Sequence, residues 1–85
     1  MEKVIIYTTN TCPYCNRAKS LLTKKNVNFT EVNIENDEAL RDEMIVKAGG
    51  KRTVPQIFIG DYHVGGCDDL YEYESQGELD KLLQG

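Results

Sequence analysis

The chain has 85 residues, a size that accommodates a single domain over 1–85. Hydrophobic residues make up 40% of it and charged residues 28%, proportions that argue against disorder and against a membrane span. The net charge of −4 argues against non-specific nucleic-acid binding, which requires a basic face. No apolar run is long enough to cross a bilayer and none resembles a secretory signal, so we expect the cytoplasm as the working compartment. We also expect a monomer.

The first half of the chain is predicted to alternate strands and helices. Residues 3–8 are rich in β-branched side chains, which is typical of a buried strand. Apolar residues recur at helical spacing over 13–25, and a second strand is predicted over 27–34. A second helix is predicted over 37–48, where a pair of glycines follows it as a stop signal.

The second half is predicted to contain a hairpin and a helix. A strand over 55–59 tolerates its proline only because the proline comes first. Gly60-Asp61 is a turn signal, so residues 62–64 are expected to return as the antiparallel partner. A helical pattern follows Gly65-Gly66 and is expected to break or bend at Gly77.

The predicted order of elements is β-α-β-α-β-β-α. One right-handed βαβ crossover followed by a hairpin produces a four-stranded mixed sheet with helices on both faces. The predicted fold class is therefore α/β, with a thioredoxin-like architecture.

Three cysteines are too few, and wrongly spaced, for the disulfide framework of a small secreted protein. Two of them form the motif Cys12-Pro13-Tyr14-Cys15 at the junction between the first strand and the first helix. Pro13 suits the first helical position, which makes Cys12 the N-cap residue. Free amides and the helix dipole then favour a thiolate, lowering its pKa from about 8.5 into a range of about 3.5–7.5. Cys15, one turn away and less exposed, can attack a mixed disulfide formed on Cys12.

A structural zinc site is the alternative use of these residues. Cys12 and Cys15 would combine with His63 and Cys67 to give three thiolates and one imidazole. The pair Cys12 and Cys15 lies farther from the pair His63 and Cys67 in the sequence than is usual for a compact zinc module. The chain also has enough apolar residues to fold without metal. Redox chemistry is the favoured interpretation.

Three sequence blocks resemble the dithiol glutaredoxins, particularly the small bacterial type. They are the Cys-Pro-Tyr-Cys block at 11–15, Thr-Val-Pro-Gln-Ile-Phe-Ile-Gly at 53–60 and Gly-Gly-Cys-Asp-Asp-Leu at 65–70. The blocks follow the order and spacing of that family, and the resemblance covers essentially the whole chain. It implies one glutaredoxin domain that uses glutathione as co-substrate, with no bound cofactor and no metal.

The resemblance also implies the residues of the site. Cys12 and Cys15 are catalytic, and the bond between Val54 and Pro55 is expected to be cis. Many family members carry a lysine three residues before the first active-site cysteine, where it can bind the glycine carboxylate of glutathione. This sequence has Thr9 at that position. Arg52 is the main candidate to replace it, and Lys51 and Lys47 are weaker ones. The expected glutathione-binding residues are Tyr14, Arg52, Thr53, Val54, Pro55, Gly66, Cys67 and Asp68.

The activity implied is reduction of protein disulfides and glutathione mixed disulfides. Ribonucleotide reductase is a client of some relatives, and the sequence alone does not decide whether it is a client here. Two further alternatives stay open: a redoxin of the same fold reduced by a flavin enzyme, and an iron–sulfur carrier that uses Cys12 and glutathione as ligands. Gly66 and Asp68 argue against the first, while Pro13 and Cys15 argue against the second.

Overall fold

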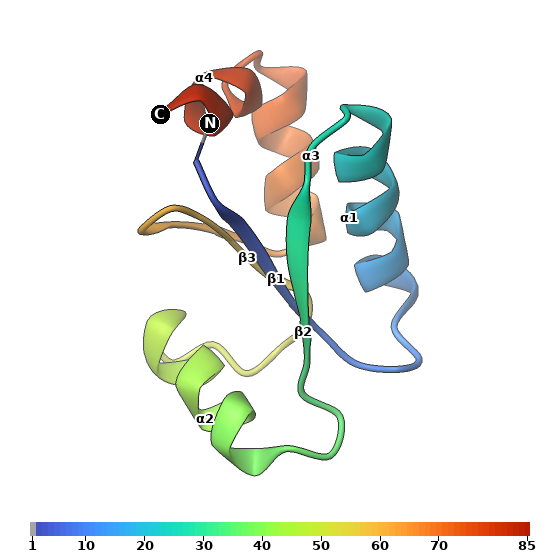
Figure 1. Ribbon diagram of the computed structural model, residues 1–85, viewed down its shortest axis with the longest axis vertical. Helices are drawn as coiled ribbons and strands as arrows, with labels where there is room; N and C mark the ends of the chain where they lie inside the picture. Colours follow the sequence, from blue (N-terminus) through green and yellow to red (C-terminus); the bar gives the residue numbers. More distant parts are fainter. Residues whose placement is uncertain (1) are drawn as a thin grey trace.

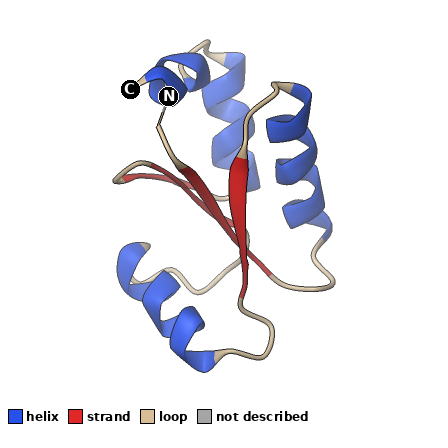
Figure 2. Cartoon of the chain, in the orientation of Figure 1, coloured by secondary structure: helices blue, strands red, loops and turns tan. Residues whose placement is uncertain are grey.

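A four-stranded mixed sheet in the order β2-β1-β3-β4 forms the centre of the computed structural model, which describes residues 2–85 (Figures 1 and 2). Strands β1 (Val4–Thr8) and β2 (Phe29–Asn33) run parallel. Strands β3 (Gln56–Ile59) and β4 (Tyr62–Gly65) form an antiparallel hairpin, and β3 also pairs antiparallel with β1. The predicted sheet is confirmed.

Helices cover both faces of this sheet (Figure 2). Helices α1 (Pro13–Lys24), α3 (Cys67–Ser75) and α4 (Leu79–Gln84) pack on one face, and α2 (Glu38–Lys47) packs on the other. The predicted break at Gly77 is confirmed, because Gly77 separates α3 from α4 with a φ of 74°. Among the residues that the structure describes, no helix has the length and apolarity needed to cross a membrane.

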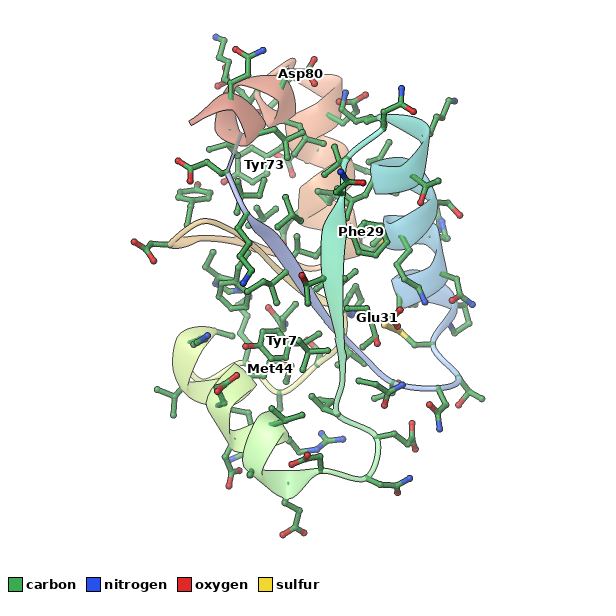
Figure 3. All side chains as sticks on the ribbon, viewed as in Figure 1. Tyr7, Phe29, Glu31, Met44, Tyr73 and Asp80 are labelled. Atoms are coloured by element: carbon green, nitrogen blue, oxygen red, sulfur yellow. A yellow bond between two sulfur atoms is a disulfide. The ribbon has the colours of Figure 1, made fainter. Side chains whose placement is uncertain are left out.

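The core is divided between the two faces because successive side chains of a strand point in opposite directions. On β1, Val4 and Ile6 point towards α1, α3 and α4, while Tyr7 points towards α2. Figure 3 shows Tyr7 beside Met44 of α2. Both faces of the sheet are therefore buried under helices.

The second strand is shorter than the sequence pattern predicts. It begins at Phe29, whereas the prediction began at residue 27. Val27 is buried, but its N–H donates to the carbonyl of Leu22 at 2.9 Å, so it belongs to the turn that follows α1. Asn26 makes this connection with a φ of 60°, a left-handed conformation that asparagine tolerates better than most residues.

Candidate active site at the start of helix α1

Cys12 is the N-cap residue of α1, as predicted. Its backbone is extended, with φ −134° and ψ 100°, and Pro13 occupies the first helical position. The Cys15 N–H donates to Cys12 Sγ at 3.1 Å, so the sulfur accepts a hydrogen bond from the first helical turn. No acidic side chain occupies this turn to oppose a negative charge on sulfur. The arrangement favours a thiolate at Cys12 when the pair is reduced.

Cys12 and Cys15 are joined as a disulfide, with their Cα atoms 5.1 Å apart. Cys12 is 8% exposed and Cys15 is 1% exposed. The two sulfurs are thus within bonding reach, and Cys12 is the one nearer to solvent. This order agrees with an attacking Cys12 and a resolving Cys15. The lowered pKa of the Cys12 thiol stays a prediction.

The segment Thr53-Val54-Pro55 faces the dithiol. The Val54–Pro55 peptide bond is cis, as the family resemblance implied. The Val54 carbonyl oxygen lies 3.8 Å from Cys12 Sγ. The segment lies outside the helices and strands, directly before β3, and it brings the Val54 backbone beside the sulfur.

A cleft of about 210 Å³ opens beside this segment. Its walls come from the start of α1, the segment before β3, and the start of α3. It brings together every glutathione-binding residue expected from the sequence except Arg52, which is exposed outside the lining. The lining residues are Tyr14, Lys51, Thr53, Val54, Pro55, Gln56, Gly66, Cys67, Asp68 and Asp69.

The cations expected near the cleft are distributed differently from the prediction. Lys51, the weaker candidate, lines the cleft, whereas its neighbour Arg52 does not. Lys47 lies elsewhere, with its Nζ atom donating to the Tyr7 hydroxyl at 3.4 Å. Lys51 is therefore the cationic residue in the lining of the cleft, and it lies two residues before Thr53.

The start of α3 forms another wall of the cleft. Asp69 accepts a hydrogen bond from the Gly66 N–H at 3.0 Å and so caps the helix. Gly66 faces the segment before β3, since a Cβ there would lie 3.5 Å from the Pro55 oxygen. Asp68 is exposed, and within residues 2–85 its side chain makes no hydrogen bond. The side chain that caps α3 is therefore Asp69 and not its neighbour Asp68.

Cys67 and His63 do not form a metal site with the dithiol. Cys67 is 4% exposed in the core, and burial raises the pKa of its thiol. His63 Nε2 lies 2.7 Å from Gln56 Oε1, and burial, followed by the charge of Lys51, lowers the pKa of the imidazole. Within the described residues, no three His, Cys, Asp or Glu side chains are grouped to hold a metal ion.

Two lining residues were missed by the sequence analysis. Gln56 was read only as part of a strand, although a polar side chain at the start of a buried strand is a signal for a structural hydrogen bond. Asp69 was passed over for its neighbour Asp68. Asp69 stands three residues after the N-cap Gly66, and this capping-box spacing is the local signal that could have identified it.

Comparison with known proteins agrees with this geometry. The Glutaredoxin family model matches residues 4–64. Glutaredoxin 3 of Escherichia coli strain K12 is 56% identical over 84 residues, which cover 99% of this chain and 100% of that protein. The solution structure of glutaredoxin from Brucella melitensis is 54% identical with a TM-score of 0.86, and the match covers 98% of this chain and 89% of that one. The crystal structure of the buckwheat glutaredoxin–glutathione complex is 28% identical with a TM-score of 0.88, covering 98% and 77%.

The sequence identity extends over the whole fold and includes the region of the dithiol. The structure places Cys12 and Cys15 where a helix start can activate one sulfur and the other can displace it. The chain therefore belongs to the glutaredoxin family, whose members are glutathione-dependent thiol–disulfide oxidoreductases.

Proposed function

We propose that this chain reduces glutathione mixed disulfides and protein disulfides by the following steps. The Cys12 thiolate attacks the glutathione sulfur of a mixed disulfide, the substrate sulfur leaves as a thiolate that takes up a proton, and glutathione becomes bonded to Cys12. A second glutathione thiolate then attacks the glutathione sulfur of this adduct. Oxidised glutathione leaves, and the Cys12 thiolate is restored.

A protein disulfide follows a branch that uses both cysteines. Cys12 attacks one substrate sulfur, and Cys15 then attacks Cys12, so that the reduced substrate leaves and a bond forms between the two cysteines. Two glutathione molecules return the pair to the dithiol and leave as oxidised glutathione. The observation that carries the proposal is the disulfide between a capping Cys12 and Cys15 beside a cleft.

We further propose how the cleft holds glutathione. The Val54 backbone pairs with the cysteinyl backbone of glutathione in the manner of a short added strand. The γ-glutamyl carboxylate lies on the free amides of Cys67 and Asp68 at the start of α3, and the Asp68 carboxylate faces the ammonium group. Two observations support this proposal: the Asp68 side chain is exposed, and the helix is capped by Asp69 instead of Asp68.

The remaining contacts complete this proposal. Tyr14, 56% exposed, flanks the sulfur end, while Thr53, Pro55 and Gly66 shape the walls. A cation from the segment before β3, Lys51 or Arg52, takes the glycine carboxylate. We place the activity in the cytoplasm, where a reducing environment keeps the dithiol available, with disulfide-bonded or glutathionylated proteins as partners.

The first prediction separates the roles of the two cysteines. We expect Cys12→Ser to lose turnover of the mixed disulfide between glutathione and 2-mercaptoethanol, because no attacking thiolate remains. We expect Cys15→Ser to stay within about threefold of the unaltered chain, because this reaction needs only one cysteine. Steady-state turnover with glutathione as reductant is the measurement. An active Cys12→Ser variant would show that the roles are assigned wrongly.

The same preparation distinguishes the alternatives. Turnover with a thioredoxin-reductase system but not with glutathione would indicate a redoxin reduced by a flavin enzyme. A visible absorption band in the protein as purified would indicate an iron–sulfur carrier, and bound zinc in elemental analysis would indicate a zinc module. We expect glutathione-dependent turnover without either signal.

A further inference from the structure

Gln56 is the buried polar side chain in the wall of the cleft. It is 1% exposed, lies at the first position of β3 and directly follows the cis bond of the loop before that strand. Burial of an amide side chain is costly unless its donor and acceptor are both hydrogen-bonded. The partners of Gln56 therefore show what the residue holds in place.

Both ends of the Gln56 side chain are used. Its Nε2 atom donates to the Thr53 carbonyl oxygen at 2.9 Å and to Thr53 Oγ1 at 3.2 Å. Its Oε1 atom lies 2.7 Å from His63 Nε2. Because an amide oxygen only accepts, the proton in this last bond belongs to His63, in the tautomer protonated at Nε2. The direction of the hydrogen bonds thus runs from His63 through Gln56 to Thr53.

His63 is itself anchored in the sheet. It lies on β4 opposite Phe58 of β3, and its ring stacks on the Phe58 ring with centroids 4.8 Å apart and planes inclined by 25°. Phe58 is buried in the core beneath α2. The imidazole therefore has a fixed position from which it holds Gln56.

The segment that receives these bonds has no regular structure of its own. Residues 51–55 lie outside the helices and strands, and Thr53 directly precedes Val54, whose carbonyl oxygen lies 3.8 Å from Cys12 Sγ. Two hydrogen bonds onto Thr53 thus restrain the backbone beside the dithiol. A backbone that receives a peptide ligand binds it more tightly when it is held in place beforehand.

We infer that Gln56 is a positioning residue for glutathione, held by His63 and acting through Thr53. The inference rests on the proposed function, in which the Val54 backbone binds glutathione. It assigns to Gln56 an effect on substrate binding and none on the attack by Cys12, because neither end of its side chain contacts a sulfur. His63 acts only through Gln56.

The test compares Gln56→Met, His63→Phe and the double variant. Methionine keeps the length of glutamine without its hydrogen bonds, and phenylalanine keeps the stacking on Phe58 without the donor. With the mixed disulfide of glutathione and 2-mercaptoethanol as substrate, we expect KM to rise about tenfold in Gln56→Met, the effect of losing about 1.4 kcal/mol of binding. We expect kcat to stay within about twofold.

Coupling between the two residues gives a second readout. If His63 acts through Gln56, His63→Phe raises KM in the unaltered chain but has no further effect in the Gln56→Met background. Tyr62→Phe is the matched control, since it removes a β4 hydrogen bond to Tyr73 on the surface, away from the cleft. We expect its KM to be unchanged. The rate of Cys12 alkylation by iodoacetamide is expected to be the same in all variants.

Each result decides between the alternatives. An unchanged KM in folded Gln56→Met, whatever its stability, would overturn the inference and leave Gln56 as a core residue only. If Gln56→Met does not fold, an unchanged KM in His63→Phe overturns it equally. Additive effects in the double variant would refute the coupling through Gln56. Failure of the unaltered chain to turn over this substrate would instead refute the proposed function.

Discussion

Cys12 and Cys67 show how the surroundings of a cysteine decide its chemistry. Both lie at the start of a helix, Cys12 as the N-cap of α1 and Cys67 as the first residue of α3. Cys12 Sγ accepts a hydrogen bond from the Cys15 N–H and lies beside the Val54 carbonyl oxygen. Cys67 is packed in the core, where burial raises the pKa of its thiol. A helix start alone therefore does not lower the pKa of a thiol, because burial opposes the charged form, and the proposed reactivity of Cys12 rests on the hydrogen bond that its sulfur accepts.

Two neighbouring cations, Lys51 and Arg52, are candidates for the proposed contact with the glycine carboxylate of glutathione. Lys51 lines the cleft and Arg52 does not. We expect Lys51→Ala to raise KM for the glutathione mixed disulfide about fivefold and Arg52→Ala to raise it by about twofold at most, because Arg52 lies outside the lining of the cleft and an exposed charge acts only weakly through solvent and salt. Higher ionic strength should reduce the difference in KM between the Lys51→Ala variant and the unaltered chain. A larger effect of Arg52→Ala would restore the residue that the sequence favoured.

At the scale of single elements, α3 begins with two adjacent carboxylates to which we assign different roles, Asp69 in stability and Asp68 in the proposed binding of glutathione. Asp69 caps the helix by accepting the Gly66 N–H, and Asp68 stays exposed at the cleft. The preceding Gly65 has a φ of 117°, and a Cβ there would collide with the Asp69 carboxylate. Glycine is thus required at this position for the cap to form.

The two carboxylates give a paired prediction. We expect Asp69→Ala to lower the free energy of unfolding by about 1 kcal/mol, the usual effect of losing a helix cap. Asp68→Ala is expected to change it by less than about 0.5 kcal/mol while raising KM for the glutathione mixed disulfide. Urea unfolding and steady-state kinetics on both variants provide the measurements. Equal losses of stability would contradict the assignment of the cap.

At the scale of the whole molecule, Glu31 connects three elements. Its carboxylate on β2 accepts from the buried Thr8 hydroxyl of β1 at 2.6 Å and from Lys19 of α1 at 3.1 Å (Figure 3 labels Glu31). The hydrogen bond from Thr8, followed by Lys19, holds the pKa of this carboxyl below its usual value of 4.5. Glu31 thus stabilises the fold where it is ionised, above that usual value, and the contribution is lost as the pH falls through the lowered pKa.

The pH dependence of folding tests this connection. We expect the free energy of unfolding of the unaltered chain to decrease as the pH falls below 4.5, partly through Glu31. In Glu31→Gln the decrease should be smaller, because the amide does not titrate. Urea titrations at neutral and acidic pH on both proteins supply the comparison. If the free energy of unfolding decreased equally with falling pH in both proteins, Glu31 would not be one of the groups that determine stability in acid.

The sequence by itself determined the order of the elements and the position of the dithiol. Strand and helix periods, the stop signal after α2 and the turn at Gly60-Asp61 are local patterns, and they predicted the four-stranded sheet with helices on both faces. The capping role of Cys12 also follows from local chemistry, since Pro13 marks the first helical position. The motifs and their spacing were enough to predict the family and to place Cys15 one helical turn after Cys12.

Only the tertiary structure decided which residues complete the cleft. Whether Lys51 or Arg52 lies in the wall depends on how the segment before β3 packs against the starts of α1 and α3. The Gln56 side chain meets His63 because β3 and β4 pair as a hairpin. The walls of the cleft come from parts of the chain that are distant in sequence. Lys51 and Arg52 are neighbours of like charge with similar local propensities, so only the packing of these distant parts decides which of them lies in the wall.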